Sequence, residues 1–296
     1  PRCHSTSSER VDHATIFAEE APYVAECARC RLRYTVSTKI ENWDEFYDDG
    51  YAPYQKRLKH HRGEIRARWL AERIGPWLAE RLAPTRFPLP FGNGRALEIG
   101  CGAGSDLRRM VDLGWEATGI EPNPSAAEKA RRWSDAPILV DLFPSPRLHN
   151  ESFQLIVAQQ VIEHLDSIDR IGNEFARLLA PGGRLFISVP NSECWSARMF
   201  GPAWIGWDVP RHRTHFTRQT LARWAREAGL IVDSISTKSH ANWISQSASQ
   251  LNAGGRTSLF TRRRWASLAN RYTAWIDQGD SLLLWARKPA ITKAAA

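Results

Sequence analysis

The stretch that decides the fold runs from Arg95 to Gly104 and reads Arg-Ala-Leu-Glu-Ile-Gly-Cys-Gly-Ala-Gly. Its apolar first half predicts a short buried strand, and the residues after Gly104 predict the start of a helix. Between them Gly100, Gly102 and Gly104 stand at alternate positions. Glycine has no Cβ, so the backbone of such a loop can turn sharply and come close to a ligand. The stretch therefore predicts a strand, a ligand-binding loop and a helix in succession.

A second strand that ends in an acid follows closely. Residues 114–121 read Gly-Trp-Glu-Ala-Thr-Gly-Ile-Glu, which places Glu121 21 residues after Gly100. A carboxylate at this distance from a glycine loop can accept hydrogen bonds from the hydroxyls of a ribose. The two segments together predict a nucleoside site at the carboxyl ends of two adjacent parallel strands.

The residues around the glycines narrow the choice of nucleoside. A dinucleotide fingerprint would place its third glycine at position 105, where this chain has Ser105. Glu98 stands two residues before the first glycine, and its charge would repel a pyrophosphate. S-adenosylmethionine has a sulfonium and an ammonium group, so the acid favours this cofactor. The alternative is that the glycines form only a tight turn.

Strand and helix patterns alternate over the following hundred residues, which is typical of a parallel sheet with crossover helices. We expect strands at 95–99, 116–120, 137–140, 153–158 and 184–189, and a final antiparallel pair at 231–236 and 281–286. We expect helices at 54–81, 105–113, 124–133, 168–179 and 218–228, and a mostly helical insertion at 241–279. The predicted fold is α/β: a doubly wound, Rossmann-like sheet of seven strands, mostly parallel with the last strand antiparallel. Residues 1–54 are expected to be an irregular N-terminal appendage to a domain of residues 55–296.

Composition sets the class of protein. Of the 296 residues, 43% are hydrophobic and 24% are charged, which is typical of a soluble globular protein. We find no apolar run long enough to span a bilayer and no signal peptide. The net charge of +8 favours either an acidic partner such as nucleic acid or simply solvated helix faces. A group of tryptophans in the second half of the chain indicates either an aromatic pocket wall or ordinary core packing: Trp195, Trp204, Trp207 and Trp243.

Residues 95–190 resemble the class I S-adenosylmethionine-dependent methyltransferases, of the group that includes the ubiquinone-biosynthesis O-methyltransferases. The resemblance implies that the glycine loop lies along the methionine part of the cofactor and that the acid after the second strand binds the ribose. The cofactor contacts that it implies are Glu98, Gly100, Cys101, Gly102, Gly104, Glu121, Pro122, Asp141, Leu142 and Gln159. Among these, Asp141 and Leu142 are expected at the adenine, and Gln159 either at the methionine end or as a plain strand terminus.

A segment rich in ionisable groups follows the fifth strand. Residues 206–217 contain Asp208, Arg211, His212 and His215, and the run Pro-Arg-His-x-x-His-Phe-Thr resembles a pattern in methyltransferases of cell-surface sugar and natural-product pathways. One interpretation is that a histidine takes a proton from the acceptor as the methyl group moves. The other is a salt-bridged lid, with Thr217 as the cap of the next helix.

His164 is a further candidate base. It follows Glu163 directly after the fourth strand, and an imidazole titrates near neutral pH. The alternative is that Glu163 and His164 only fix the loop through side-chain hydrogen bonds.

The cysteines suggest a metal. Cys27 and Cys30 have the C-x2-C spacing of a zinc knuckle, and Cys3 supplies a third thiol. Because the chain begins with Pro1, we expect residues before it, among them the fourth ligand. The alternative is free thiols. An uneven set of isolated cysteines predicts a reducing compartment, here the cytoplasm.

The expected function is transfer of a methyl group to oxygen, nitrogen or carbon of a small molecule such as a sugar or a natural-product intermediate. An RNA or protein methyltransferase is the first alternative, suggested by the positive charge and the cysteines. The fourth strand does not end in the Asn- or Asp-Pro-Pro-aromatic motif of nucleobase amine methylation. A cofactor-binding scaffold without activity is the second alternative.

Overall fold

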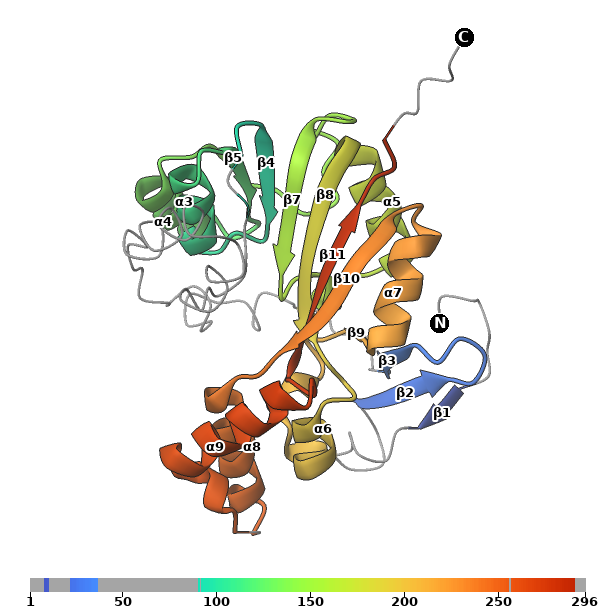
Figure 1. Cartoon of the computed structure of the whole chain (residues 1–296), viewed down its shortest axis with the longest axis vertical. Coiled ribbons are helices and arrows are strands. Elements are labelled where there is room, and N and C mark those ends of the chain that lie inside the picture. Colours follow the sequence, from blue (N-terminus) through green and yellow to red (C-terminus); the bar gives the residue numbers. More distant parts are fainter. Residues whose placement is uncertain (1–7, 11–21, 37–89, 91, 256, 291–296) are drawn as a thin grey trace. The chain divides into compact units, whose positions relative to one another are not determined.

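The computed structural model describes residues 8–10, 22–36, 90, 92–255 and 257–290 (Figure 1). The expected helix at 54–81, the boundary at residue 54 and Cys3 lie outside these residues. The chain divides into two compact units. One consists of Asp44–Val157, and the other combines Pro1–Trp43 with Ala158–Ala296.

The main sheet has seven strands in the order β10-β11-β8-β7-β4-β5-β6. The strands are β4 (Arg95–Ile99), β5 (Glu116–Ile120), β6 (Ile138–Leu139), β7 (Phe153–Gln159), β8 (Leu179–Pro190), β10 (Ile231–Lys238) and β11 (Ser281–Arg287). β5 pairs in parallel with both β4 and β6, whereas β11 runs antiparallel to both β8 and β10. The expected α/β, Rossmann-like architecture is confirmed. The strand order reverses at β4, which is where ligands bind in open sheets of this kind.

Side-chain caps mark the start of some of the helices. The described α-helices are α3 (Ser105–Asp112), α4 (Pro124–Ser134), α5 (Ile168–Leu178), α6 (Trp195–Phe200), α7 (Arg218–Glu227), α8 (Ala241–Ala253) and α9 (Arg263–Trp275). Asn123 caps α4 by accepting a hydrogen bond from the amide of Ala126 at 2.8 Å. Thr217 and Thr220 form a capping box at the start of α7, as expected for Thr217. In the second unit, α5 and α7 pack against β8, β10 and β11 (Figure 1).

The helix α5 ends before the Pro-Gly-Gly run that the sequence marks as its terminator. The run from Pro181 to Gly183 predicts a turn that terminates α5, but α5 ends at Leu178 and the run lies inside β8. The amide of Gly182 donates to the carbonyl of Lys288 at 3.1 Å, and the amide of Lys288 donates to the carbonyl of Gly183 at 2.9 Å. Pairing with the chain beyond β11 therefore extends the strand through residues that alone would favour a turn.

The described part of the N-terminal segment, residues 8–10 and 22–36, forms strands and is not irregular as expected. β1 (Ser8–Arg10), β2 (Tyr23–Cys27), β3 (Arg33–Val36) and β9 (Thr214–His215) form a second, antiparallel sheet in that order. These strands have five residues or fewer, and β9 lies far away along the sequence. Local patterns could not reveal a sheet that depends on such a distant partner.

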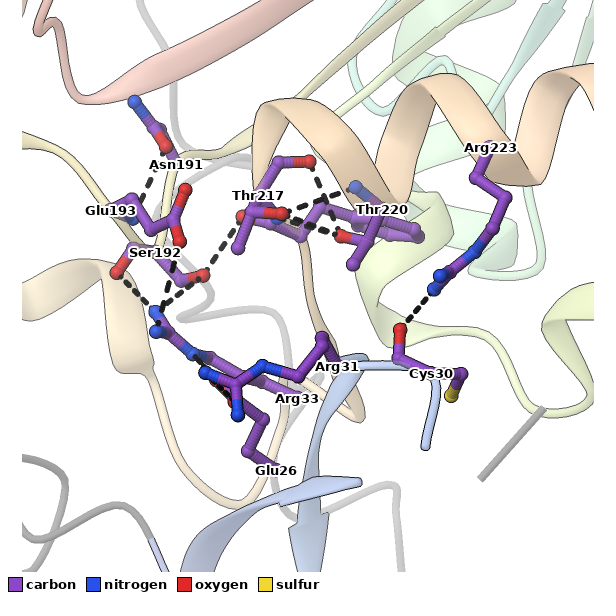
Figure 2. A network of polar contacts seen from close by, with 11 residues as sticks. Glu26, Cys30, Arg31, Arg33, Asn191, Ser192, Glu193, Thr217, Thr220 and Arg223 are labelled. Atoms are coloured by element: carbon purple, nitrogen blue, oxygen red, sulfur yellow. Dashed lines mark hydrogen bonds and ion pairs between the residues drawn. The ribbon is translucent and has the colours of Figure 1, made fainter. Parts of the chain in front are cut away.

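A polar network joins this sheet to the rest of its unit (Figure 2). The guanidinium of Arg33 donates to Oε2 of Glu26 at 2.8 Å and to the backbone carbonyl of Ser192 at 2.8 Å. The guanidinium of Arg223, on α7, donates to the carbonyl of Cys30. Arginine suits this task because its planar group offers several donors at once. The described N-terminal strands are thereby fixed to α7 and to the loop after β8.

The insertion of α8 and α9 has its own apolar cluster. Trp204 and Trp207 are buried in it together with residues of α6 and α8, and Trp195 and Trp243 pack against it. Core packing is thus the observed role of these tryptophans. Among the described helices, none combines the length and the apolar character needed to cross a membrane.

Candidate functional site

The glycine loop joins the ends of β4 and β5 as the sequence predicts. Ile99 pairs with Ile120, and the amide of Gly100 donates to the carbonyl of Ile120 at 2.8 Å. Gly100, Gly102 and Gly104 have φ angles of 64°, 53° and 81°, a region that glycine adopts without strain. The loop therefore depends on glycine for its backbone conformation.

Glu121 is held against this loop. Its side chain is 2% exposed, and Oε2 accepts a hydrogen bond from the amide of Gly102 at 2.9 Å. Oε1 accepts a second one from the amide of Asn123 at 3.0 Å. Two backbone donors thus fix the carboxylate at the tips of both strands, which is where a carboxylate can accept from the hydroxyls of a ribose. Sequence reasoning missed Asn123, although its position before a proline-started helix marks it as a cap.

Gly104 and a further glycine, Gly119, explain the close packing around the loop. A Cβ on Gly104 would lie 2.8 Å from Cα of Ala130, so glycine is required here for packing of α3 on α4 as well as for its φ angle. A Cβ on Gly119 would lie 2.7 Å from Sγ of Cys101, so this glycine makes room for the thiol. Burial raises the pKa of Cys101, and the charges of Glu98 and Glu121 raise it further. The thiol is therefore neutral and packs beneath the loop.

The charge around the loop fits a cation. Glu98 and Glu121 are both buried, and both act electrostatically on Cys101 between them. Two carboxylates beside a loop of bare backbone suit a ligand with a sulfonium and an ammonium group, and they oppose a phosphate. The described residues thus fit S-adenosylmethionine.

The end of β6 offers the flank expected for an adenine. The side chain of Asp141 accepts hydrogen bonds from Oγ of Ser145 at 2.6 Å and from the amide of Leu142 at 2.9 Å, and the Ser145 bond lowers the pKa of Asp141. Leu142 is 70% exposed, and Val140 is also exposed. An ionised, fixed carboxylate between exposed apolar side chains can accept from a base edge while the apolar groups contact the ring. Pro122 lies exposed after Glu121.

The polar end of β7 belongs to the other unit. The side chain of Gln160 donates to Oγ of Ser188 at 3.0 Å, and the amide of Gln160 donates to the carbonyl of Ser188 at 2.7 Å. Gln160 therefore fastens β7 to β8. Gln159 is partly buried, and its contact with the cofactor stays a prediction.

The ionisable segment after β8 folds into a partly buried cluster. The guanidinium Nε of Arg211 lies 3.0 and 3.1 Å from the carboxylate oxygens of Asp208, and Nε2 of His212 lies 3.6 Å from Oδ2 of Asp208. The rings of His164 and His212 meet edge to face with centroids 4.6 Å apart. Burial lowers the pKa of His212, so the ring is neutral at neutral pH. Catalysis by these residues stays a prediction.

His215 lies deeper in the same unit. It is buried in β9, and its Nε2 is 2.9 Å from Oγ1 of Thr35 on β3. Burial lowers its pKa well below the ordinary histidine value. The described contacts give His215 a role in joining the two segments, and its catalytic role also stays a prediction.

Cys27 and Cys30 flank the turn between β2 and β3. The amide of Cys30 lies 3.5 Å from Sγ of Cys27, and the turn closes with hydrogen bonds from Arg31 to Cys27 and from Cys27 to Leu32. Arg31 has a positive φ of 58°. Two buried thiols on one tight turn fit the ligand spacing of a zinc knuckle.

Comparison with known proteins places the chain in a family. The family described as "Methyltransferase domain" matches residues 66–235. A ubiquinone biosynthesis O-methyltransferase of Xanthomonas oryzae is 28% identical over 167 residues, which cover 52% of this chain and 70% of that protein. A protein of the same name from Xylella fastidiosa is 26% identical over 173 residues, covering 52% and 68%.

Solved structures share the fold. A chain from the Haloferax volcanii complex of the Trm112 methyltransferase activator superposes with a TM-score of 0.53 at 19% identity, covering 77% of this chain and 96% of its own. The Haemonchus contortus phosphoethanolamine N-methyltransferase 2 has a TM-score of 0.50 at 16% identity, covering 87% and 62%.

Proposed function

The chain belongs to the methyltransferase domain family and is an S-adenosylmethionine-dependent methyltransferase. From this premise we propose that the protein methylates a small molecule at an oxygen, nitrogen or carbon atom. The carboxylate of Glu121, fixed by the amides of Gly102 and Asn123 at the tips of two strands, carries the proposal for the cofactor. The names of the relatives support a small-molecule acceptor.

The chemistry makes modest demands on the protein. The sulfonium already activates the methyl group, so the enzyme must mainly hold the acceptor in line with the carbon–sulfur bond. A base is required only where the acceptor atom starts protonated. His212 and His215, both neutral, are the candidates for that role.

The acceptor can be found by following a label. Purified protein incubated with methyl-labelled S-adenosylmethionine and a fractionated small-molecule extract should transfer the label to a compound below the size of a polymer. The transfer should disappear in the Glu121→Ala variant. Label that appears only in RNA or protein fractions would contradict a small-molecule acceptor.

One surface favours the RNA alternative. The exposed residues Arg262, Arg263 and Arg264 lie at the start of α9, and Trp275 at its end is 82% exposed. Arginines and an aromatic ring on one helix can contact phosphates and bases. Binding of RNA that persists at moderate salt, together with label transfer to RNA, would make RNA the acceptor; binding that vanishes at moderate salt would reflect charge alone.

We also propose that Cys27 and Cys30 hold a structural zinc ion, with Cys3 as a further ligand. Full-length protein should contain about one zinc ion at a thiolate site. After replacement by Co²⁺ it should show the near-ultraviolet thiolate-to-metal absorption band. The Cys27→Ser variant should lose this band, whereas Cys194→Ser, at a buried cysteine on another segment, should keep it. If the Co²⁺-substituted wild-type protein lacks this absorption band, the proposed zinc site at Cys27 and Cys30 is refuted.

A further inference from the structure

A carboxylate and two imidazoles converge just after β7. Glu163 and His164 lie in the short helix η4 (Ile162–His164), and His212 lies in the segment before β9. One donor atom from each of the three residues lies within 4.8 Å of the other two. The amide of Arg213 donates to the carbonyl of Glu163 at 2.6 Å, which fixes the two segments side by side. All these residues belong to one compact unit.

Glu163 lacks the partner that a buried carboxylate requires. Its side chain is 0% exposed, and among the described residues neither carboxylate oxygen has a hydrogen-bond partner. Burial raises the pKa of Glu163 to about 8, and the backbone amides of Glu163 and Val161 lower it only in part. Burying polar atoms without a hydrogen-bond partner costs about 1–3 kcal/mol. Arg211 does not meet this need through any hydrogen bond to Glu163, since its guanidinium pairs with Asp208.

Both imidazoles have the orientation of metal ligands. Nδ1 of His164 lies 3.1 Å from the carbonyl of Arg211, and Nδ1 of His212 lies 3.0 Å from the carbonyl of Gly206. A carbonyl oxygen can only accept, so each Nδ1 carries the hydrogen and each Nε2 carries the lone pair. Histidines that bind metals are commonly oriented by such a bond from the other ring nitrogen. The backbone thus sets the tautomer that a cation needs.

We propose that Glu163, His164 and His212 bind a divalent transition-metal ion. One carboxylate and two imidazoles are ligands of Zn²⁺ and its first-row neighbours, whereas Mg²⁺ and Ca²⁺ prefer oxygen. Bonds of about 2.0–2.1 Å place the donor atoms of a tetrahedral ion roughly 3.3 Å apart. The ligand atoms of the three residues lie within 4.8 Å of one another, so binding requires the side chains to bring them closer together. Three protein ligands leave a coordination position for water or another molecule.

The surrounding charges are compatible with a cation. Asp208 adds a second carboxylate beside His212, with Oδ2 3.6 Å from Nε2, and it pairs with the guanidinium of Arg211. This site is distinct from Cys27 and Cys30, because it contains no sulfur.

The test compares wild-type protein with Glu163→Gln, which keeps the shape of the side chain and removes its charge. Metal-free protein is titrated with Zn²⁺ by calorimetry, and with Co²⁺ by absorption spectroscopy. We expect Glu163→Gln to bind one metal equivalent less per chain, or to bind it more than about 100-fold more weakly, because even residues behind the ligands change metal affinity about 10–100-fold. In Glu163→Gln, the visible d–d absorption bands of the Co²⁺ ion at this site should be lost, and any thiolate-to-Co²⁺ band should be unchanged.

His212→Asn should have the same effect as Glu163→Gln. Two exposed positions provide matched controls, Glu116→Gln and His149→Asn, and both should bind as the wild type does. Thermal unfolding excludes loss of the fold as the cause: Glu163→Gln should melt close to the temperature of metal-free wild type, since it keeps the shape of the side chain, but it should not gain stability from Zn²⁺. Equal metal content and equal Zn²⁺ stabilisation in wild type and Glu163→Gln would overturn the site, as would a loss of the thiolate band alone.

Discussion

Replacing Glu121 by alanine is expected to weaken binding of S-adenosylmethionine by at least about 100-fold. The change removes a carboxylate that we place on the ribose, and hydrogen bonds to charged groups contribute about 1.5–3 kcal/mol each. Two such bonds exceed the roughly 2.8 kcal/mol that corresponds to 100-fold. The Glu121→Ala substitution also leaves the amides of Gly102 and Asn123 without their acceptor, so the loop loses its fixed conformation. Isothermal calorimetry with the purified variant measures the effect.

A matched control is available on the same strand. Glu116 is an exposed acid at the start of β5, so Glu116→Ala should leave the affinity for the cofactor unchanged. Circular dichroism and thermal melting show whether Glu121→Ala is folded. A folded Glu121→Ala variant with wild-type affinity would refute the assigned site.

Replacing Gly104 by alanine is expected to lower stability by about 2–5 kcal/mol and the melting temperature by roughly 5–15 °C. A residue with a side chain pays about 1–2 kcal/mol for the left-handed conformation, here at a φ of 81°. The new Cβ would also stand 2.8 Å from Cα of Ala130, which is backbone and cannot rotate away. Because Gly104 begins α3 directly after the loop, cofactor affinity should fall as well.

Gly229→Ala separates the two causes. Gly229 has a φ of 80°, close to that of Gly104, but no atom lies within 4 Å of the position that its Cβ would take. This variant should therefore lose only the conformational part, about 1–2 kcal/mol. Equal losses in the two variants, measured by chemical or thermal unfolding, would show that the contact with Ala130 costs nothing.

The strands and helices of the main sheet could be predicted because each carries its own local signal. The apolar run 95–99 and the cap at Thr217 both depend on neighbours in the sequence, and the structure has a strand and a helix start at these places. The glycine loop and Glu121 could be predicted for the same reason. Their spacing along the chain is the spacing that parallel strands impose in space.

The rest depends on contacts between distant residues. β3 exists as a strand between β2 and β9, and its partner His215 lies 182 positions after Arg33. The burial of Glu163 beside His212 likewise depends on how the segment after β8 returns to the end of β7. No local pattern encodes these approaches. For the histidines, the sequence indicated ionisable groups in one region, but it could not show that carbonyls of Arg211 and Gly206 hold their rings.

The second sheet also determines where this protein can be shortened. A chain cut at residue 54, the boundary that the sequence suggests, would remove β1, β2 and β3, of which β3 lies beside β9, together with the Arg33 guanidinium that binds Ser192. β9 would then present an open edge, and open edges recruit strands from other molecules. A fragment intended for expression or crystallisation should therefore retain β1 to β3, since a catalytic domain trimmed by sequence similarity alone would tend to aggregate.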